Sequence, residues 1–358
     1  MKLHSYILLC SVFLVSCEEF RYPLDSLPKG DVNTSLGDTV YVQQYPIWTG
    51  FNEPEDVIVG NEPFVYVADY GNNRVVMLEL TGRVVGYSTY IKHPIAIAQD
   101  KRLQLIVCAE FDTLLPGNAA TTFGAVYRID LPAVNHLISA ATPRRVFIEL
   151  NDPSRRYTGI ATILGNSYYL TRTGPKNELN RIDRDNAILG FASNDSLVTP
   201  ITAGFSPDGS GLLSIHTVTG IATPPNSKNY DYAFCQIGAS ALYKVQWIRL
   251  VAEGQTTNWV SKFYTSADGA VDILKVNRFE NPQGMTFDPS QNLFVVDAAK
   301  DSLIRFTSAG AEKYSFGGHG SGELQFDHPS GVAFHEKTLY VSDRNNNRIV
   351  RFKLSTDF

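Results

Sequence analysis

Histidine and carboxylate side chains are the groups in this 358-residue sequence that could hold a metal ion. His93, His216 and His328 are far apart, and no H-x-H or H-x-x-x-H spacing sets two imidazoles on one face of a strand or helix. We expect no metal or other cofactor on this evidence. If the fold did bring ligands together, Glu55, His93 and His328 would be the candidates for Ca²⁺ or Zn²⁺.

Other catalytic motifs are missing from the sequence. There is no G-x-S-x-G elbow, P-loop, C-x-x-C-H or H-E-x-x-H segment. The chain is therefore more readily explained as a binding protein than as an enzyme of these classes. A metal-assisted hydrolase or lyase, with converging carboxylates or imidazoles, remains the alternative.

Arginine and aromatic side chains could instead recognise a ligand. An arginine fork binds an anionic sugar or a peptide carboxylate, and an aromatic ring stacks on a sugar or packs on a peptide. The predicted ligand-binding residues are Trp48, Arg156, Tyr157, Arg172, His216, Tyr230 and Tyr232.

The amino-terminal segment carries a different chemistry, that of lipidation. A short apolar stretch, Ile7 to Val15, ends in Leu14-Val15-Ser16-Cys17. It is too short to span a bilayer stably, and it resembles a bacterial lipobox, in which the cysteine thiol is acylated, for example with palmitate. We predict a signal peptide over residues 1–16, lipidation at Cys17 and a flexible tether over 17–37.

Glu18-Glu19 resembles the acidic export signal of surface lipoproteins in Bacteroidetes. The expected location is the outer membrane with the chain on the cell surface, and a periplasm-facing anchor is the alternative. The ligand would be a glycan or a protein, and membership of a surface uptake complex is a third possibility. The formal net charge of −5 makes nucleic acid an unlikely partner.

A repeat organises the chain after residue 38. A proline-led strand, an aromatic-rich strand that ends in aspartate and a strand that opens with arginine recur near residues 54–76, 282–306 and 329–350. Two copies share an Asp-x-x-Asn-Asn-Arg core, Asp69–Arg74 and Asp343–Arg348. We expect the aspartate and arginine of each core to pair as a structural lock of the turn.

This pattern resembles the NHL repeat of β-propellers. The resemblance implies an all-β, six-bladed propeller over residues 38–358, with inner strands that begin near residues 54, 94, 158, 203, 282 and 329. The last blade lacks an outer strand, and Thr39 to Gln43 are expected to supply it and so close the ring. In lactonase-type propellers a Glu, Asn and Asp set binds calcium at the centre, and Glu55 could begin such a set. Propeller amidating lyases carry a histidine where this chain has Glu55, Ile95, Gln283 and Ser330, which argues against that activity.

Two long loops are predicted on one face of the ring, over residues 111–123 in blade two and 217–240 in blade four. That face, called the top face, is where the inner strands begin. The loops would wall a shared cleft or simply pack on the rim. Arg144 to Leu150 and Ala187 to Phe191 are expected as outer strands, and Ala133 to Ala141 as a short helix.

Overall fold

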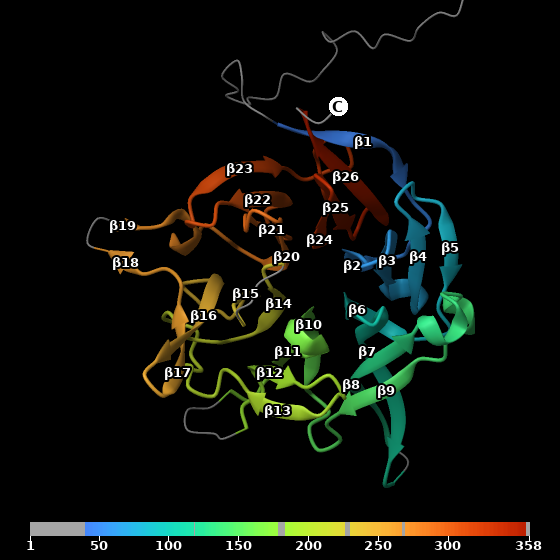
Figure 1. Ribbon diagram of the computed structural model, residues 1–358, viewed down its shortest axis with the longest axis horizontal. Helices are drawn as coiled ribbons and strands as arrows, with labels where there is room; N and C mark the ends of the chain where they lie inside the picture. Colours follow the sequence, from blue (N-terminus) through green and yellow to red (C-terminus); the bar gives the residue numbers. More distant parts are fainter. Residues whose placement is uncertain (1–39, 118, 178–182, 226–229, 267–268, 356–358) are drawn as a thin grey trace, which may run out of the picture. The chain divides into compact units, whose positions relative to one another are not determined.

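The computed structural model describes residues 40–117, 119–177, 183–225, 230–266 and 269–355. Over these residues the chain forms six four-stranded antiparallel sheets, plus one small hairpin. The sheets stand around a common axis like the blades of a propeller (Figure 1). The predicted six-bladed fold is therefore confirmed, whereas the predicted signal peptide, Cys17 and the tether lie outside the described residues.

Each blade runs from an inner strand at the axis to an outer strand at the rim. Blades 1 to 3 are β2 (Pro54–Val59), β3 (Phe64–Asp69), β4 (Arg74–Glu79), β5 (Val84–Tyr87); β6 (Lys92–Gln99), β7 (Gln104–Leu115), β8 (Ala119–Asp130), β9 (Arg144–Ile148); and β10 (Arg156–Thr162), β11 (Tyr168–Thr173), β12 (Ala187–Phe191), β13 (Leu197–Pro200). Blades 4 to 6 are β14 (Val218–Ala222), β15 (Tyr232–Gln236), β16 (Val245–Glu253), β17 (Thr256–Ser261); β20 (Pro282–Phe287), β21 (Leu293–Asp297), β22 (Ser302–Phe306), β23 (Glu312–Gly317); and β24 (Pro329–His335), β25 (Thr338–Asp343), β26 (Arg348–Leu354), β1 (Tyr41–Trp48).

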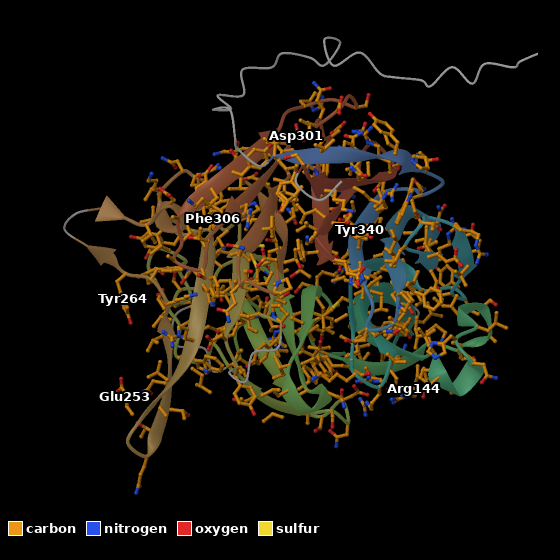
Figure 2. The ribbon with its side chains drawn as sticks, turned by 45° about the horizontal axis from the view of Figure 1, so that its top comes forward. Arg144, Glu253, Tyr264, Asp301, Phe306 and Tyr340 are labelled. Carbon is orange, nitrogen blue, oxygen red and sulfur yellow. The ribbon has the colours of Figure 1, made fainter. Side chains whose placement is uncertain are left out.

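The small elements lie between these strands. They are the hairpin β18 (Thr265–Ser266) and β19 (Gly269–Ala270), and the 3₁₀ turns η2 (Tyr70–Asn72), η3 (Pro132–Val134), η4 (Ile138–Ala140), η5 (Leu164–Asn166) and η6 (Asp272–Leu274). The helix expected over Ala133 to Ala141 is thus two 3₁₀ turns. Figure 2 shows Glu253 at the end of the β16–β17 hairpin, which projects from the propeller. No helix in the described part of the chain is long and apolar enough to cross a membrane.

The ring is closed by the first strand of the chain. β1 pairs antiparallel with β26, from Tyr41 opposite Leu354 to Trp48 opposite Ile349. The closure expected from Thr39 to Gln43 is therefore confirmed, although the strand runs on to Trp48. Pairing of the first and last strands removes the open sheet edge that would otherwise remain at the seam.

The inner strands touch one another around the whole ring. Hydroxyl groups near the start of three inner strands donate to backbone carbonyls at the start of the next, Thr158 to Val218 at 2.7 Å, Thr219 to Pro282 at 2.6 Å and Ser330 to Pro54 at 3.1 Å. Glycine follows each of these residues because the strands approach closely: a Cβ on Gly220, for example, would meet the carbonyl oxygen of Gln283. The inner strands therefore all begin at the same face, the top face.

The hydrophobic core is divided into six clusters, one between each pair of neighbouring blades. Between blades 4 and 5, for example, the ring of Trp247 lies edge-on to Phe287 with centroids 4.6 Å apart. Burial of a Val, Ile or Phe side chain contributes roughly 1.5–3 kcal/mol. Each blade is therefore stabilised mainly by its two neighbours, as in other repeat proteins.

Blade four corrects the sequence prediction. Its inner strand begins at Val218 and not near residue 203, and the predicted loop over residues 217–240 contains β14 and β15. The segment 201–217 is instead the link from blade 3 to blade 4, in which Ser206 forms an isolated bridge with Ser214. That bridge and its apolar flank, Leu212 to Ile215, resemble a strand pair in sequence but are not part of a blade.

The two predicted loops are also not on one face. Residues 111–123 are the ends of β7 and β8 with their turn, a regular hairpin beyond the top face. The β14–β15 connection lies at the opposite face, where Thr223 donates to the carbonyl of Thr162 at the far end of β10. Blade 3 differs too, since Ala187 to Phe191 form its third strand and Leu197–Pro200 its outer strand.

Candidate functional site

A central channel runs between the six inner strands and encloses a cavity of about 330 Å³. Every inner strand lines it, with apolar side chains such as Ile97 and Phe287 and polar ones such as Glu55, Asp56 and Gln283. Cavities that bind small molecules are typically about 300–1,000 Å³ and carry a few convergent polar groups. The channel therefore has the size and lining of a small-ligand site.

Asp56 is the unusual residue of this wall. It follows the irregularity near the start of its inner strand, at the position that Ala96, Gly159, Gly220, Gly284 and Gly331 occupy in the other five blades. Its carboxyl accepts hydrogen bonds from the backbone of Val57 at 2.8 Å and, across the blade boundary, of Ile97 at 2.9 Å. Burial nevertheless dominates and raises the pKa of Asp56 to about 7.

Glu55 stands next to Asp56, at the top-face end of the channel. Its carboxylate lies 2.8 Å from the Arg344 guanidinium, which also donates to Glu53 at 2.8 Å. Burial raises the pKa of Glu55 to about 7, and the attraction of Arg344 opposes that rise. Arg344 comes from the β25–β26 turn, so this cluster joins blade 6 to blade 1.

A second group continues around the channel entrance. The ring of Tyr70 stacks on His93 with centroids 4.5 Å apart, and His93 is 2.9 Å from Glu110. Glu110 also accepts a hydrogen bond from Arg156 at 2.8 Å. Arg344 lies 5.7 Å from the centre of the Tyr70 ring, which connects the two groups.

We call this set the entrance strip. It is partly exposed and spans blades 6, 1, 2 and 3, and its members are Glu53, Glu55, Tyr70, His93, Glu110, Arg156 and Arg344. An arginine fork, carboxylates and a stacked ring pair are the groups that hydrogen-bond and pack on sugars or on peptide side chains. The strip lies on the side of the channel entrance formed by blades 6, 1, 2 and 3, and Glu55 connects it to the lining of the cavity.

Four of the residues predicted to bind ligand are buried. Trp48 is wedged between blades 6 and 1 against Tyr340, and Tyr232 is fully enclosed in β15. Tyr157 donates to Glu149 at 2.9 Å, and Arg172 pairs with the same carboxylate at 2.6 Å. None of the four offers the free surface that stacking on a ligand or binding an anion requires. The prediction that these four residues bind a ligand is therefore corrected: they are part of the buried interior.

The other three predicted residues are accessible but dispersed. Arg156 belongs to the entrance strip. His216 contacts Thr217 through its Nδ1 at 2.9 Å in the link to blade 4. Tyr230 is exposed, but its carbonyl accepts from Tyr169 near the opposite face of the ring. Only Arg156 therefore lies at the channel entrance.

Sequence reasoning missed four residues of the strip, Glu53, Tyr70, Glu110 and Arg344. One signal was present: Arg344 stands in the Asn-rich turn of blade 6 where blade 1 has Tyr70, so the two copies of the turn differ at an exposed position. Glu110 had no such signal, because its contact with His93 arises only when β6 and β7 pair.

The Asp–Arg locks of the repeat are present as predicted. Arg74 Nε lies 2.7 Å from Asp69, and Arg348 Nε lies 2.7 Å from Asp343. These pairs hold the turns at the top ends of blades 1 and 6.

The suggested metal ligands are engaged elsewhere. Glu55 pairs with Arg344 and His93 with Glu110, and these two with His328 do not form a group of ligand atoms within 4.8 Å. Among the described residues, the group that meets this distance is Asp301, His319 and Asp327.

The thiols are structural. Cys108 and Cys235 are buried and free, and burial raises the pKa of both, that of Cys235 to about 12. A thiol held protonated in this way is a poor nucleophile.

Comparison with known families supports the assignment of the repeat. Residues 326–352 match the family model of the NHL repeat. The match covers β24, β25 and most of β26, which includes the Asp343–Arg348 lock.

Solved structures share the propeller fold. An aldose sugar dehydrogenase from Streptomyces coelicolor has a TM-score of 0.58 at 13% identity, over 89% of this chain and 99% of the other. An auxiliary nutrient binding protein from Bacteroides thetaiotaomicron has 0.57 at 12%, over 85% and 70%. A gluconolactonase from Xanthomonas campestris has 0.54 at 12%, over 89% and 90%. At such identities the likeness concerns the fold alone. A search of curated proteins found no match.

Proposed function

We propose that this propeller is a lipid-anchored binding module that takes a glycan, or a protein segment of similar polarity, across the channel entrance. The observation that carries the proposal is the entrance strip: two arginines, three carboxylates and the Tyr70–His93 stack gathered around the charged end of the channel. Such a mixture favours a polar, uncharged or weakly charged ligand, because each charged group already has a partner of opposite sign.

The channel would receive the end of the ligand. A cavity of about 330 Å³ suits a small sugar unit or one side chain, and its wall supplies hydroxyl groups besides Glu55 and Asp56. The fold is shared with auxiliary nutrient binding proteins of two Bacteroides species. That likeness supports a binding role, whereas the proposed attachment through Cys17 rests on the Leu14-Val15-Ser16-Cys17 segment of the sequence.

The test is an array of glycans and peptides probed with the full chain, followed by titration of any ligand found. Arg344→Ala and Tyr70→Ala should each weaken binding by at least about tenfold, which corresponds to 1.4 kcal/mol. Arg83→Ala is the matched control, since Arg83 is an exposed arginine of blade 1 that pairs with Glu79 away from the channel. Equal affinity of all three variants would contradict the proposal.

The anchor is tested separately. Cells that express the chain and its Cys17→Ser variant are fed an alkyne analogue of palmitate. Only the parent should incorporate the label. If the chain faces outward, protease treatment of intact cells should release or degrade the propeller. A label on the variant would exclude Cys17 as the modified residue.

A second candidate is a hydrolase or lyase in the channel. It is favoured by the two adjacent carboxyl groups, Glu55 and Asp56, whose pKa values of about 7 suit general acid–base catalysis. Turnover of an array-identified glycan that is lost in Asp56→Ala would favour this candidate over binding alone.

A further inference from the structure

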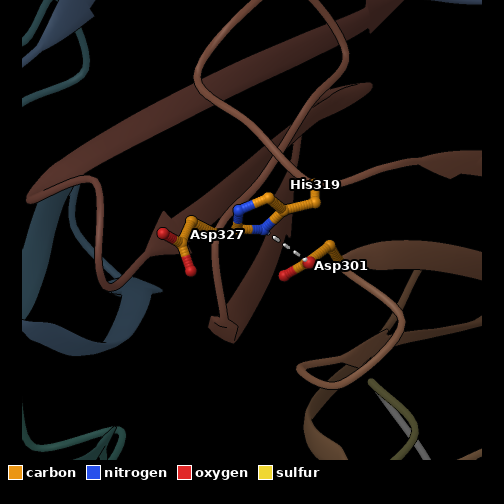
Figure 3. Close-up of side chains that lie close together, drawn as sticks. All are labelled: Asp301, His319 and Asp327. Carbon is orange, nitrogen blue, oxygen red and sulfur yellow. Dashed lines mark hydrogen bonds and ion pairs between the residues drawn. The ribbon is translucent and has the colours of Figure 1, made fainter.

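Two carboxyl groups and an imidazole meet on the top face, where blade 5 joins blade 6. Asp301 ends the β21–β22 turn of blade 5, and His319 and Asp327 belong to the link from blade 5 to blade 6. Figure 3 shows the imidazole of His319 beside both carboxyl groups. One ligand atom from each residue lies within 4.8 Å of the other two, and His319 Nδ1 is 3.1 Å from Asp301 Oδ2.

The link that carries His319 is held in place by the backbone. Gly318 donates to the carbonyl of Asp301 at 2.8 Å, and Phe326 donates to Gly318 at 3.0 Å. Gly320 donates in turn to Phe326 at 2.9 Å. His319 is thus pinned on both sides, although its own side chain is largely exposed.

The repeat shows what is special about Asp301. The matching residues in the turns of blades 1 and 6 are asparagines, Asn73 and Asn347. All three have a left-handed backbone and accept a hydrogen bond through Oδ1 from the residue before the next inner-strand proline. For Asp301 that donor is His328, at 2.7 Å. An asparagine would serve this role equally well, so the aspartate adds something the turn does not need: a second anionic oxygen, Oδ2, that faces His319.

Asp327 is arranged in a similar way. One of its oxygens, Oδ1, accepts from the Asn345 side chain at 2.8 Å. Its backbone N–H donates to Asp343 at 2.7 Å, a contact that Asn52 makes with Asp69 in blade 1. In blade 1 the uncharged Asn52 fills the same structural role as Asp327, and Oδ2 of Asp327 is left for another partner.

The cluster lacks a compensating cation. Among the described residues, neither Asp301 nor Asp327 pairs with a lysine or arginine, and the neighbouring Arg344 is occupied by Glu53 and Glu55. We propose that Asp301, His319 and Asp327 bind a divalent transition-metal ion, for which Zn²⁺ is the probe, and that the ion ties the blade 5 turn to the link before blade 6.

The donor set fits this ion class. One imidazole with two carboxylates suits Zn²⁺ better than Ca²⁺, which prefers six or more oxygen ligands. Zinc bonds are about 2.0–2.2 Å long, so the three ligand atoms, which lie within 4.8 Å of one another, would move closer together on binding. The hydrogen bonds from His328 and Asn345 orient the carboxylates, as outer partners do in zinc sites.

The test uses the full chain without a histidine tag, treated with a chelator and titrated with ZnCl₂ by calorimetry. One saturable site is expected. Asp301→Asn, which installs the residue of blades 1 and 6, should weaken zinc binding by about 10–100-fold or more while the melting temperature of the metal-free chain is unchanged. His319→Ala should weaken it similarly.

The control is His335→Ala, which removes another histidine beside a carboxylate, Glu336. It should titrate like the parent. The proposal is overturned if the parent shows no saturable zinc site, if Asp301→Asn binds zinc like the parent, or if only Ca²⁺ binds. Glycan binding is not part of this assay, so its result is independent of the proposed function.

Discussion

Blades 1 and 6 are neighbours built on the same turn, yet they use it differently. Both contain Asp-x-x-Asn-Asn-Arg, and in both the arginine Nε lies 2.7 Å from the aspartate. In blade 6 the arginine is 7% exposed and also donates to the carbonyls of Ser321 and Gln325. In blade 1 it is 26% exposed, donates to one carbonyl, that of Gly50, at 3.3 Å, and lies over the ring of Tyr87. The same lock therefore stabilises blade 6, which carries the ring closure, more than blade 1.

The differences between the two copies also mark the candidate sites. Blade 1 has Asp56 where blade 6 has Gly331, and blade 6 has Arg344 where blade 1 has Tyr70. The Asp–Arg pairs that the two blades share stabilise the fold. The residues that differ, Asp56 and Arg344, lie in the channel wall and at its entrance.

The largest expected effect tests the lock of blade 6. Asp343 is fully buried and accepts from Arg348, Asn346 and the backbone of Asp327. Asp343→Ala leaves a buried guanidinium without its carboxylate, which costs about 3–5 kcal/mol of unfolding free energy. Urea unfolding measures this loss. A loss below about 1 kcal/mol would mean that the backbone contacts of Arg348 suffice, and the contrast with blade 1 would disappear.

The second effect concerns Asp56, the residue that blade 6 replaces with glycine. Its pKa of about 7 in the fold exceeds the ordinary aspartate value of about 3.9. The unfolded chain ionises first, so this group contributes its full stability below about pH 4 and loses it as the pH rises through 7. The difference of about 3 pKa units corresponds to a loss of about 4 kcal/mol.

Asp56→Ala is the matched variant, because alanine occupies this position in blade 2 as Ala96. Melting temperatures of the two proteins should be measured from pH 4 to 8. The melting temperature of the parent should fall relative to that of the variant as the pH rises. The remaining slope of the variant would include Glu55, whose pKa is raised in the same direction. Parallel curves would show that Asp56 is already ionised at low pH.

The same comparison explains how far the sequence predicted the structure. Blades 1, 5 and 6 begin with proline and end their second strand in aspartate, and their inner strands were placed correctly from these signals. Blade 4 begins at Val218 without proline and has Gln236 where the others have the lock aspartate. The apolar run Leu212 to Ile215 then competed as a strand, and only the packing of β14 between β10 and β20 decides against it.

The site was predicted less well for a related reason. Arg156 could be singled out as a local cationic residue, but its partner Glu110 comes from another blade. Tyr157 and Arg172 were selected by residue type, and that type equally suits the buried network around Glu149. The type of a side chain alone does not show whether it lies on the solvent face or on the core face of a half-buried strand.

The third prediction returns to the lock of blade 1. Arg74→Ala should cost only about 1–2 kcal/mol, because Arg74 is 26% exposed and Arg348 only 7%, while the aspartate keeps its other hydrogen bonds in both blades. Urea unfolding beside Arg348→Ala makes the comparison direct, and the blade 6 variant should be the less stable. The reverse order would mean that exposure does not set the strength of the lock.

The smallest expected effect is that of Asp301→Asn on the metal-free chain. Asn73 and Asn347 hold the equivalent turns in blades 1 and 6 through the same Oδ1 contact. The variant loses only the contact between Oδ2 and His319, which is largely exposed, so the unfolding free energy should change by less than about 0.5 kcal/mol. Asn347→Ala, which removes the Oδ1 acceptor itself, should cost about 1 kcal/mol by the same urea assay. If Asp301→Asn were the more destabilising of the two, Oδ2 of Asp301 would stabilise the fold. The comparison with blades 1 and 6 would then no longer indicate a role for this oxygen in metal binding.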